Sequence, residues 1–455
     1  MRTRFMSIFG VAVLISVGLL VACSSKYSSS NNGLVILSTQ AIPVMDTFSL
    51  DLTNGHISQI FNVKGPTPQG LPTSVVLDPA GAYAYVATTI TCTPKLPANT
   101  SLGGAVQGAI LAYQVASDGK LGEVGGPTYL PGNPAYASTG FPTCGLDDAT
   151  NPNAGNAPSA LVIDSAGKYL FVATAQGGVT FTTNLNATPT PTVATLNSVG
   201  IVVFAVGSNG SLTQVPGSPF ALQQIGSQFP SPSALAVTPT VFPTAFAICA
   251  VNVPPTTENL YVTDSLNYEV LNYKVSSTGA LTYVSENPTG TVPSGVTVDP
   301  CNRFVYVANG VPDNNVSAFT ICNAISLPTC PNADDSLLPV TGSPFTAGSG
   351  GTGPLGPIMM DAYANFLYVL NTGQGTILGY RVSTSTGTLT ALTPTPVVTN
   401  GFPSAMAIRS DDSWMFVTNT NQGSVSEYAI TPATGALTPQ PAVQTDPTPW
   451  GVAVK

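Results

Sequence analysis

One phrase recurs along this chain, and its last copy is cut short. Each copy starts with a proline and an apolar run, passes a polar turn and continues into an aromatic or β-branched run. The C-terminus from Pro449 (PTPWGVAVK) holds only the opening run, and the segment from Leu34 (LVILST through TNGHISQI) holds only the remainder. A repeat with complementary fragments at its two ends predicts a closed ring. The six remaining copies start at Pro72, Pro158, Pro232, Pro293, Pro354 and Pro403.

Each copy reads as four short strands separated by turns. In the copy from Pro403, the runs SAMAI, WMFVTN, SVSEYAI and ALTP alternate with the polar clusters SDDS, TNQG and TPATG. Such runs favour β-strands and such clusters favour turns, and no segment keeps an apolar period of 3.6 residues. The interval to Pro449 lies within the roughly 40–50 residues of a propeller blade. We name the strands A to D and expect each copy to be one antiparallel blade.

The two terminal fragments set the number of blades. Blade 1 would take strands B to D from residues 34–62 and strand A from residues 449–454, with six complete blades between them. Pairing of the termini in one sheet removes the free edges of an open array. We therefore predict an all-β fold, a seven-bladed β-propeller of four-stranded antiparallel blades closed by the C-terminal strand. An open β-solenoid is the main alternative, but it does not explain the split copy.

The first residues differ from the repeats and read as an export signal. Two arginines precede an apolar run that is short for a membrane span of about 20 residues. Leu20-Val21-Ala22-Cys23 resembles the lipobox of bacterial lipoproteins, which implies cleavage before Cys23 and a lipid on its thiol. Residues 1–22 would be the signal peptide, 23–33 a flexible tether and 34–455 the propeller. Ser24 favours the outer membrane, so we expect a lipid-anchored envelope protein; an ordinary secretory signal with an incidental cysteine is the alternative.

Composition excludes one class of partner. Charged residues make up 7% of the chain, against a usual value of about 25%, and the net charge is −9. An acidic chain without a Lys/Arg cluster lacks the charge that a nucleic-acid backbone requires. Hydrophobic content of 43% is ordinary, so a core can form beneath a surface of Ser, Thr, Asn and Gly.

Six cysteines follow Cys23, and an even number in an exported chain suggests disulfides. Sequence alone allows 15 pairings. In a propeller, B–C and D–A loops share one face, while A–B and C–D loops share the other. The blade assignment then selects Cys92–Cys144 on the first face, Cys249–Cys301 between two A–B connections, and Cys322–Cys330 within one C–D excursion.

The A–B pair of strands carries a family resemblance. Its D-x-x-G turn and its Y/F-V-x-T/N strand, nearest to YVTN at Phe416–Asn419, are similar to those of lactonase-type seven-bladed propellers. That family includes bacterial 6-phosphogluconolactonase and the YVTN-repeat surface proteins. The resemblance covers nearly everything after residue 33. It implies the propeller fold and, for enzymes of the family, His, Glu and Arg side chains near the central channel.

The expected acid–base set does not map onto this chain. His56 is the one histidine and lies in a C–D turn at the outer rim of blade 1. Arg303 and Arg409 fall in A–B turns, on the face away from the usual site, and Arg381 lies on strand C. No G-x-S-x-G, H-E-x-x-H, P-loop or C-x-x-C motif is present. Lactone hydrolysis is therefore the second choice on sequence grounds.

Polar residues recur where strand B ends, at a position that would ring one mouth of the channel. Their oxygens suit calcium, which some six-bladed lactonases hold in the channel with such residues. The ring thus predicts a ligand or ion site, with calcium as the possible cofactor, and no dedicated metal motif accompanies it. Side-chain capping of the B–C turn is the alternative that recurrence favours. The candidates are Asp264, Asn309, Asn371 and Asn419, with Thr88 and Thr174 at matching places.

Other polar and aromatic residues have structural explanations. Asp78, Asp164 and Asp299 recur in the A–B turn, where aspartate caps backbone amides. Core packing explains Trp414 and Trp450 on strands B and A. Two further acids, on the insertion that carries Cys144, either overhang the channel face or are solvated loop residues: Asp147 and Asp148.

These observations favour a binding or scaffolding module at the cell surface. The membrane would be reached through the lipid on Cys23, and the B–C/D–A face would bind a glycan, a peptide or a protein. The alternative is a lactonase-type hydrolase that uses the central channel face.

Overall fold

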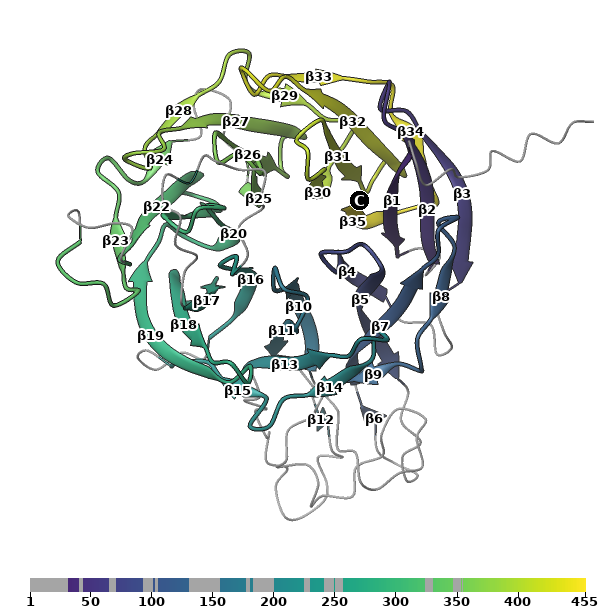
Figure 1. Cartoon of the computed structure of the whole chain (residues 1–455), viewed down its shortest axis with the longest axis horizontal. Coiled ribbons are helices and arrows are strands. Elements are labelled where there is room, and N and C mark those ends of the chain that lie inside the picture. The colour runs from purple at the N-terminus through teal and green to yellow at the C-terminus, as the bar shows by residue number, and fades with distance from the viewer. Residues whose placement is uncertain are drawn as a thin grey trace, which may run out of the picture.

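The computed structural model describes most of the chain from Asn32 onward, and its strands form a ring around an open centre (Figure 1). The described ranges are residues 32–40, 44–64, 71–92, 101–102, 105–130, 156–176, 181–182, 200–224, 230–240, 249, 257–323, 330–346, 353 and 355–455. In these ranges no helix is long and apolar enough to cross a membrane.

The described strands build seven antiparallel sheets in the order A-B-C-D from the centre outward, which confirms the predicted propeller. The A strands are β35 (Pro449–Val454), β4 (Leu71–Leu77), β10 (Asn156–Ile163), β16 (Pro232–Val237), β20 (Pro293–Val298), β25 (Leu355–Met360) and β30 (Pro403–Ile408). The B strands are β1 (Asn32–Thr39), β5 (Tyr83–Cys92), β11 (Tyr169–Gln176), β17 (Glu258–Asp264), β21 (Phe304–Asn309), β26 (Phe366–Asn371) and β31 (Trp414–Asn419).

Strands C and D complete each blade toward the rim. The C strands are β2 (Val44–Asp51), β7 (Ala105–Val115), β13 (Gly200–Val206), β18 (Glu269–Val275), β22 (Asn315–Ile321), β27 (Thr376–Val382) and β32 (Ser424–Ile430). The D strands are β3 (Ile57–Lys64), β8 (Leu121–Glu123), β14 (Leu212–Gln214), β19 (Leu281–Pro288), β23 (Leu337–Pro339), β28 (Leu389–Ala391) and β33 (Leu437–Pro439). Two short strands outside the blades pair with each other: β6 (Ser101–Leu102) and β12 (Phe181–Thr182).

Strand D is broken in five blades, which the sequence did not predict. A second short segment pairs with the other half of strand C: β9 (Thr128–Tyr129), β15 (Phe220–Ala221), β24 (Phe345–Thr346), β29 (Val397–Val398) and β34 (Val443–Gln444). In blade 3 the break is Pro-Gly-Ser-Pro, and the Ser218 hydroxyl accepts a hydrogen bond from the Val203 amide at 2.9 Å. In blade 5, Ser343 accepts one from Ala318 at the same distance. A hydroxyl thus satisfies the amide that the interrupted ladder leaves without a carbonyl.

The ring closes between the two ends of the chain. Strand β35 pairs antiparallel with β1, with Val35 opposite Val454 and Leu37 opposite Val452. Blade 1 thus combines the C-terminal strand with the three N-terminal ones, as the split repeat predicted.

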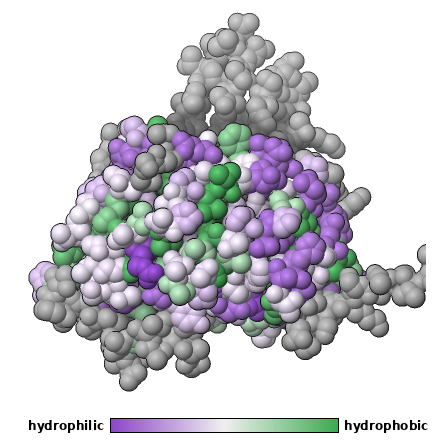
Figure 2. Space-filling model, turned by 90° about the horizontal axis from the view of Figure 1, so that it is seen from above, coloured by the Kyte–Doolittle hydropathy of each residue, from purple (hydrophilic) through white to green (hydrophobic). Residues whose placement is uncertain are grey.

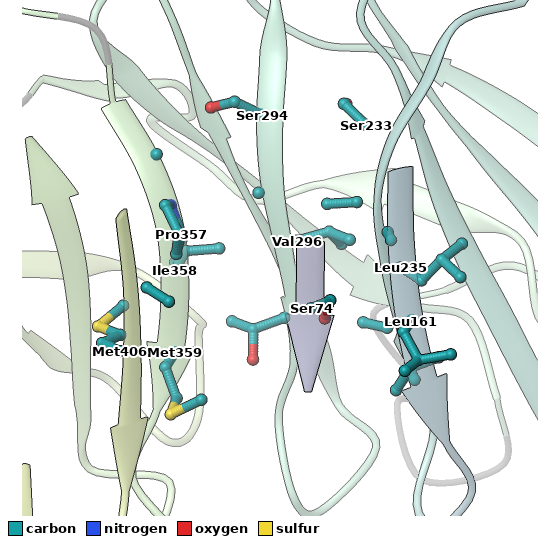
Figure 3. A pocket seen from close by; sticks show the side chains of 18 of the residues that line it. Ser74, Leu161, Ser233, Leu235, Ser294, Val296, Pro357, Ile358, Met359 and Met406 are labelled. Carbon is teal, nitrogen blue, oxygen red and sulfur yellow. The ribbon is translucent and has the colours of Figure 1, made fainter. Parts of the chain in front are cut away.

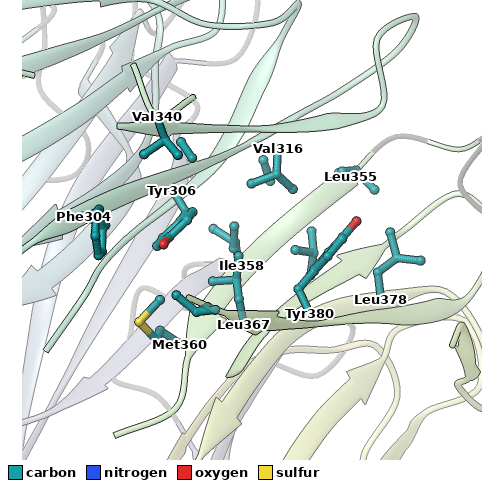
Figure 4. Close-up of a cluster of buried hydrophobic side chains, with 14 of the residues drawn as sticks. Phe304, Tyr306, Val316, Val340, Leu355, Ile358, Met360, Leu367, Leu378 and Tyr380 are labelled. Carbon is teal, nitrogen blue, oxygen red and sulfur yellow. The ribbon is translucent and has the colours of Figure 1, made fainter. Parts of the chain in front are cut away.

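Hydrophobic cores lie between neighbouring blades. Seven clusters of buried side chains occupy the seven interfaces, and the one between blades 5 and 6 is typical (Figure 4). There Tyr306 and Val316 of blade 5 pack against Ile358, Leu367 and Tyr380 of blade 6. The strand B runs are buried on both faces because each lies between two such interfaces.

The motif tyrosine of strand B ties neighbouring blades together. The hydroxyl of Tyr306 donates to the carbonyl of Gly387 in the C–D turn of the next blade at 2.9 Å, and Tyr368 donates to Gly435 at 2.8 Å. Gly435 has φ +72°, and a Cβ there would lie 2.4 Å from the Phe366 ring. This turn therefore requires glycine for both its conformation and its close approach.

The predicted cross-links can be checked in two of three cases. Cys249–Cys301 and Cys322–Cys330 form as predicted, with Cα–Cα distances of 5.4 and 5.3 Å. Cys144 lies outside the described residues, so its pairing with Cys92 stays a prediction.

The A–B turn aspartates also have the predicted structural role. Asp164 accepts from the Tyr169 amide at 3.0 Å, and Asp78 accepts from the Tyr83 amide at 2.6 Å. Asp299 accepts from the amides of Cys301 and Arg303.

Candidate functional site: the central channel

The seven A strands surround a cavity of about 770 Å³ along the propeller axis (Figure 3). Within the described sheets each strand A pairs on one side only, with strand B, so the polar groups of its other edge face the channel. A cavity of this size falls in the range of about 300–1,000 Å³ that small-molecule sites occupy.

A ring of hydroxyls lies where strand A begins, at the B–C/D–A mouth. The residue after the initial proline lies at a shift in the A–B register, and in five blades it is Ser or Thr. Ser233 donates to Pro293 of the next blade at 2.6 Å, and Ser294 donates to Leu355 at 2.6 Å. The hydroxyls therefore line the mouth and also tie successive blades. The ring consists of Thr73, Ser159, Ser233, Ser294 and Ser404.

Deeper in the channel the lining becomes apolar. In Figure 3 the side chains of Leu161, Leu235, Val296, Ile358 and Met406 lie around the cavity below Ser233 and Ser294, and Ser74 adds one hydroxyl at the level of Leu161. The channel thus offers hydroxyl and strand-edge backbone groups with apolar contacts, a combination that suits an uncharged ligand carrying its own hydroxyls.

No side chain in the described lining ionises near neutral pH. All of its residues are Ser, Thr, Gly, Ala, Val, Leu, Ile, Met, Pro or Trp. A general base must lie within hydrogen-bond reach of the proton it removes, and none of these residue types serves as one unaided. The described lining also provides no cation for a phosphate or carboxylate of a ligand.

Blade 1 departs from the hydroxyl ring. At the corresponding position of β35 stands Trp450, which is 39% exposed and lines the cavity. The prediction that core packing explains both tryptophans is right for Trp414, which is 8% exposed, and wrong for Trp450. The difference arises because Trp450 lies where the A–B register shifts and turns toward the mouth. The sequence does offer one signal for this exposure: most other copies begin with Pro-Ser or Pro-Thr, whereas this copy begins with Pro449-Trp450.

The predicted ring of Asp and Asn residues does not line the cavity. Asp264, Asn309, Asn371 and Asn419 are fully buried. Asp264 accepts from the amides of Ser231 at 2.9 Å and Leu266 at 3.0 Å, so it caps its own B–C turn. The turn-capping alternative describes this geometry, and a ligand role for the ring stays a prediction.

The three asparagines of the ring likewise bond to residues of their own blade and not to the cavity. Asn309 donates to Asn315 at 2.7 Å and to Ser317 at 2.9 Å, and Asn419 donates to Ser426 at 2.9 Å. Asn371 accepts from the Gln374 amide at 3.1 Å. At the matching place in blade 3, Thr174 donates to the carbonyl of Gly200 at 3.0 Å. Each side chain therefore stabilises the end of its own strand B.

The remaining sequence candidates lie away from the channel. His56 is exposed in the C–D turn of blade 1. Arg303 pairs with Asp299 at 2.6 Å in an A–B turn, Arg381 lies over the Phe366 ring, and Arg409 pairs with Asp411. Three candidates fall outside the described residues: Cys23, Asp147 and Asp148.

The described residues hold no group of three or more His, Cys, Asp or Glu side chains that would suit a metal ion. The calcium site suggested by the ring therefore stays a prediction. The sequence offers no signal for another feature, a set of carboxyls whose pKa is raised by burial. Burial raises the pKa of Glu427 on β32 to about 7, and the nearby Ile57 amide partly offsets this effect; among the described residues neither carboxyl oxygen has a hydrogen bond of normal geometry. It lies outside the channel lining.

Known proteins resemble this architecture. A 7-bladed β-propeller lactonase family model matches residues 341–454, which confirms the predicted resemblance over that segment. A candidate 6-phosphogluconolactonase of Bacteroides fragilis has 15% identity and a TM-score of 0.63, covering 94% of this chain and 99% of its own. A periplasmic gluconolactonase of Pseudomonas aeruginosa has 15% identity and a TM-score of 0.62, covering 93% and 99%.

At these identities the structural likeness shows the fold alone. A search of curated proteins finds no match. The chain is thus a seven-bladed β-propeller that matches the seven-bladed lactonase family over its last two blades and the closing strand of blade 1.

Proposed function

We propose that this protein acts on neutral sugar-type lactones, with the ligand held in the central channel. The observation that carries the proposal is the uncharged lining of a cavity of about 770 Å³. The family match and the fold of the gluconolactonase neighbours support a lactone as the ligand class. In the reaction, water would add to the ring carbonyl, the ring C–O bond would break, and a hydroxy acid would be released.

The same lining favours an unphosphorylated substrate. Burial of a phosphate requires Arg, Lys or several aligned donors to offset its desolvation. The described lining has neither cation. A neutral sugar lactone instead needs hydroxyl and backbone partners, which the serine ring and the free edges of the A strands provide.

Binding without turnover is the second candidate, and one observation favours it. Hydrolysis needs a base for the attacking water, and the described lining contains no side chain that serves as one. A neutral sugar ligand bound for transport, sensing or attachment would need no such group. The lipid anchor and the envelope location expected from Cys23 would place either activity outside the cytoplasm.

Proton release from gluconolactone and from 6-phosphogluconolactone, after subtraction of the spontaneous rates, separates the two candidates. Lactonase activity is expected on the neutral lactone and not on the phosphorylated one. Calorimetric binding of gluconolactam, a stable ring analogue, without turnover would favour the second candidate. Absence of both binding and turnover would refute the channel as a sugar site.

A matched pair of variants tests the role of charge. Thr73 is half-buried at the channel mouth, so Thr73→Lys adds a cation there. Tyr363→Lys adds a cation to an exposed A–B turn on the opposite face. The first is expected to improve binding of glucose 6-phosphate relative to glucose, and the second to change neither. Equal effects of both variants would mean that channel charge does not set selectivity.

A further inference from the structure

Two exposed aromatic residues lie on the loops and strands of the channel-mouth face, and one of them, Trp450, lines the cavity. Trp450 is 39% exposed, and Phe402, in the D–A loop before blade 7, is 55% exposed. The B–C turn of blade 7 bonds to the backbone of Phe402 and to that of Pro449, the residue before Trp450. The Thr420 amide donates to the carbonyl of Phe402 at 3.0 Å, and its hydroxyl donates to Pro449, beside Trp450, at 3.3 Å.

Fixed polar groups accompany these aromatic residues. Asn421 is exposed in the same turn and accepts from the Phe402 amide at 2.8 Å, which fixes the loop against the turn. The hydroxyl of Ser404, the ring member next to Trp450, donates to Pro449 at 3.2 Å. The described surface seen from the side is mostly hydrophilic or weakly polar, with hydrophobic residues in narrow patches (Figure 2). Trp450 differs from the other exposed aromatic residues because it also lines the cavity, where a ligand can reach it.

We infer that Trp450 is the stacking surface for a neutral pyranose-type ring at the channel mouth. The indole gives a flat apolar face to the C–H groups of the ring, and the hydroxyls and amides around it satisfy the ring's hydroxyls. The inference rests on the proposed function for the site and adds a residue that selects cyclic over open-chain ligands. A hydroxyl at this position, as in five of the other blades, would bind both kinds of ligand alike.

The chain offers a clean spectroscopic test because it contains two tryptophans, and the other one, Trp414, is buried. Gluconolactam is expected to change the emission of Trp450 in a saturable way. Trp450→Phe should abolish the signal and retain most of the affinity measured by calorimetry. Trp450→Ala should weaken binding about tenfold, or ~1.4 kcal/mol. Sorbitol, which has hydroxyls but no ring, should bind both proteins equally.

Tyr363→Ala is the matched control, because Tyr363 is 38% exposed on the opposite face. It should leave binding unchanged, and unaltered thermal unfolding of each variant checks its fold. Gluconolactam binding with no emission change and no loss in Trp450→Ala would overturn the inference while leaving the proposed function standing. A stable ring sugar that binds through Trp450 without any lactone turnover would uphold the inference and remove the hydrolase. Equal loss for gluconolactam and sorbitol would also overturn it.

Discussion

The motif tyrosine of strand B provides the sharpest test of the ring's energetics. Tyr306 and Tyr368 each donate to a C–D turn carbonyl of the next blade. Tyr261 occupies the same place in blade 4 and is fully buried, but its hydroxyl has no partner among the described residues. The reason lies in blade 5, where the Cys322–Cys330 excursion replaces the glycine turn.

The three Tyr→Phe substitutions should therefore change the free energy of unfolding differently. At Tyr306 or Tyr368 the change removes one hydrogen bond and leaves a buried carbonyl unpaired, which costs about 1–2 kcal/mol of unfolding free energy. At Tyr261 it removes a buried hydroxyl that makes no bond, so the desolvation penalty disappears with no bond lost. The expected result is no destabilisation, or a gain of about 1 kcal/mol.

Equilibrium urea unfolding measures the difference directly. The midpoints of the Tyr306→Phe and Tyr368→Phe proteins should fall, that of Tyr261→Phe should stay or rise, and all slopes should match the wild type. The Tyr261 variant is the matched control, since it has the same chemistry and burial. A loss at Tyr261 as large as at Tyr306 would show that the hydroxyl stabilises the ring in some way other than the bond to the glycine turn.

Three further predictions concern charge, closure and cross-linking. Burial raises the pKa of Glu427 to about 7 from an ordinary 4.5, so its contribution to stability is complete below about pH 4.5 and is lost as pH rises through 7. Glu427→Gln should remove this pH-dependent loss of stability, which amounts to up to about 3 kcal/mol. The melting temperature of the variant should therefore fall less between pH 5 and pH 8 than that of the wild type. Deletion of residues 449–455 removes the strand that pairs with β1 and should destabilise the whole ring; circular dichroism showing an equally stable truncate would refute closure. Non-reducing peptide mapping should recover Cys92 linked to Cys144, and any other partner would mean that the loop assignment is wrong.

The fold could be predicted because the repeat carries its own register. Proline before an apolar run, an aspartate turn and a Y/F-V-x-T/N strand recur in nearly every copy, so each residue's place in one blade applies to the others. The two fragments at the ends then determine closure, and closure determines which cysteines share a face. Cys249–Cys301 follows from this reasoning and is present.

The site could be predicted far less well, because position along a strand does not reveal direction toward the channel. Asp264 looked like a ligand by type and place, but its carboxylate faces its own turn. Trp450 looked like core because it is large and lies on a strand, yet a register shift turns it outward. Burial of Glu427 depends on packing between the first and last blades, which no single repeat contains.

Four of the described cations are held on the face away from the channel mouth. Lys168 donates to the carbonyl of Ser277, Arg303 to Thr384, Arg381 to Ala433 and Lys455 to Gly81, each reaching an adjacent blade. All four bonds lie at A–B or C–D turns, on the face away from the hydroxyl ring. Because these side chains join neighbouring blades there, they are not available at the mouth. A phosphorylated ligand would thus need a cation that the described mouth does not have, whereas a neutral ring needs only what Trp450 and the serines already present.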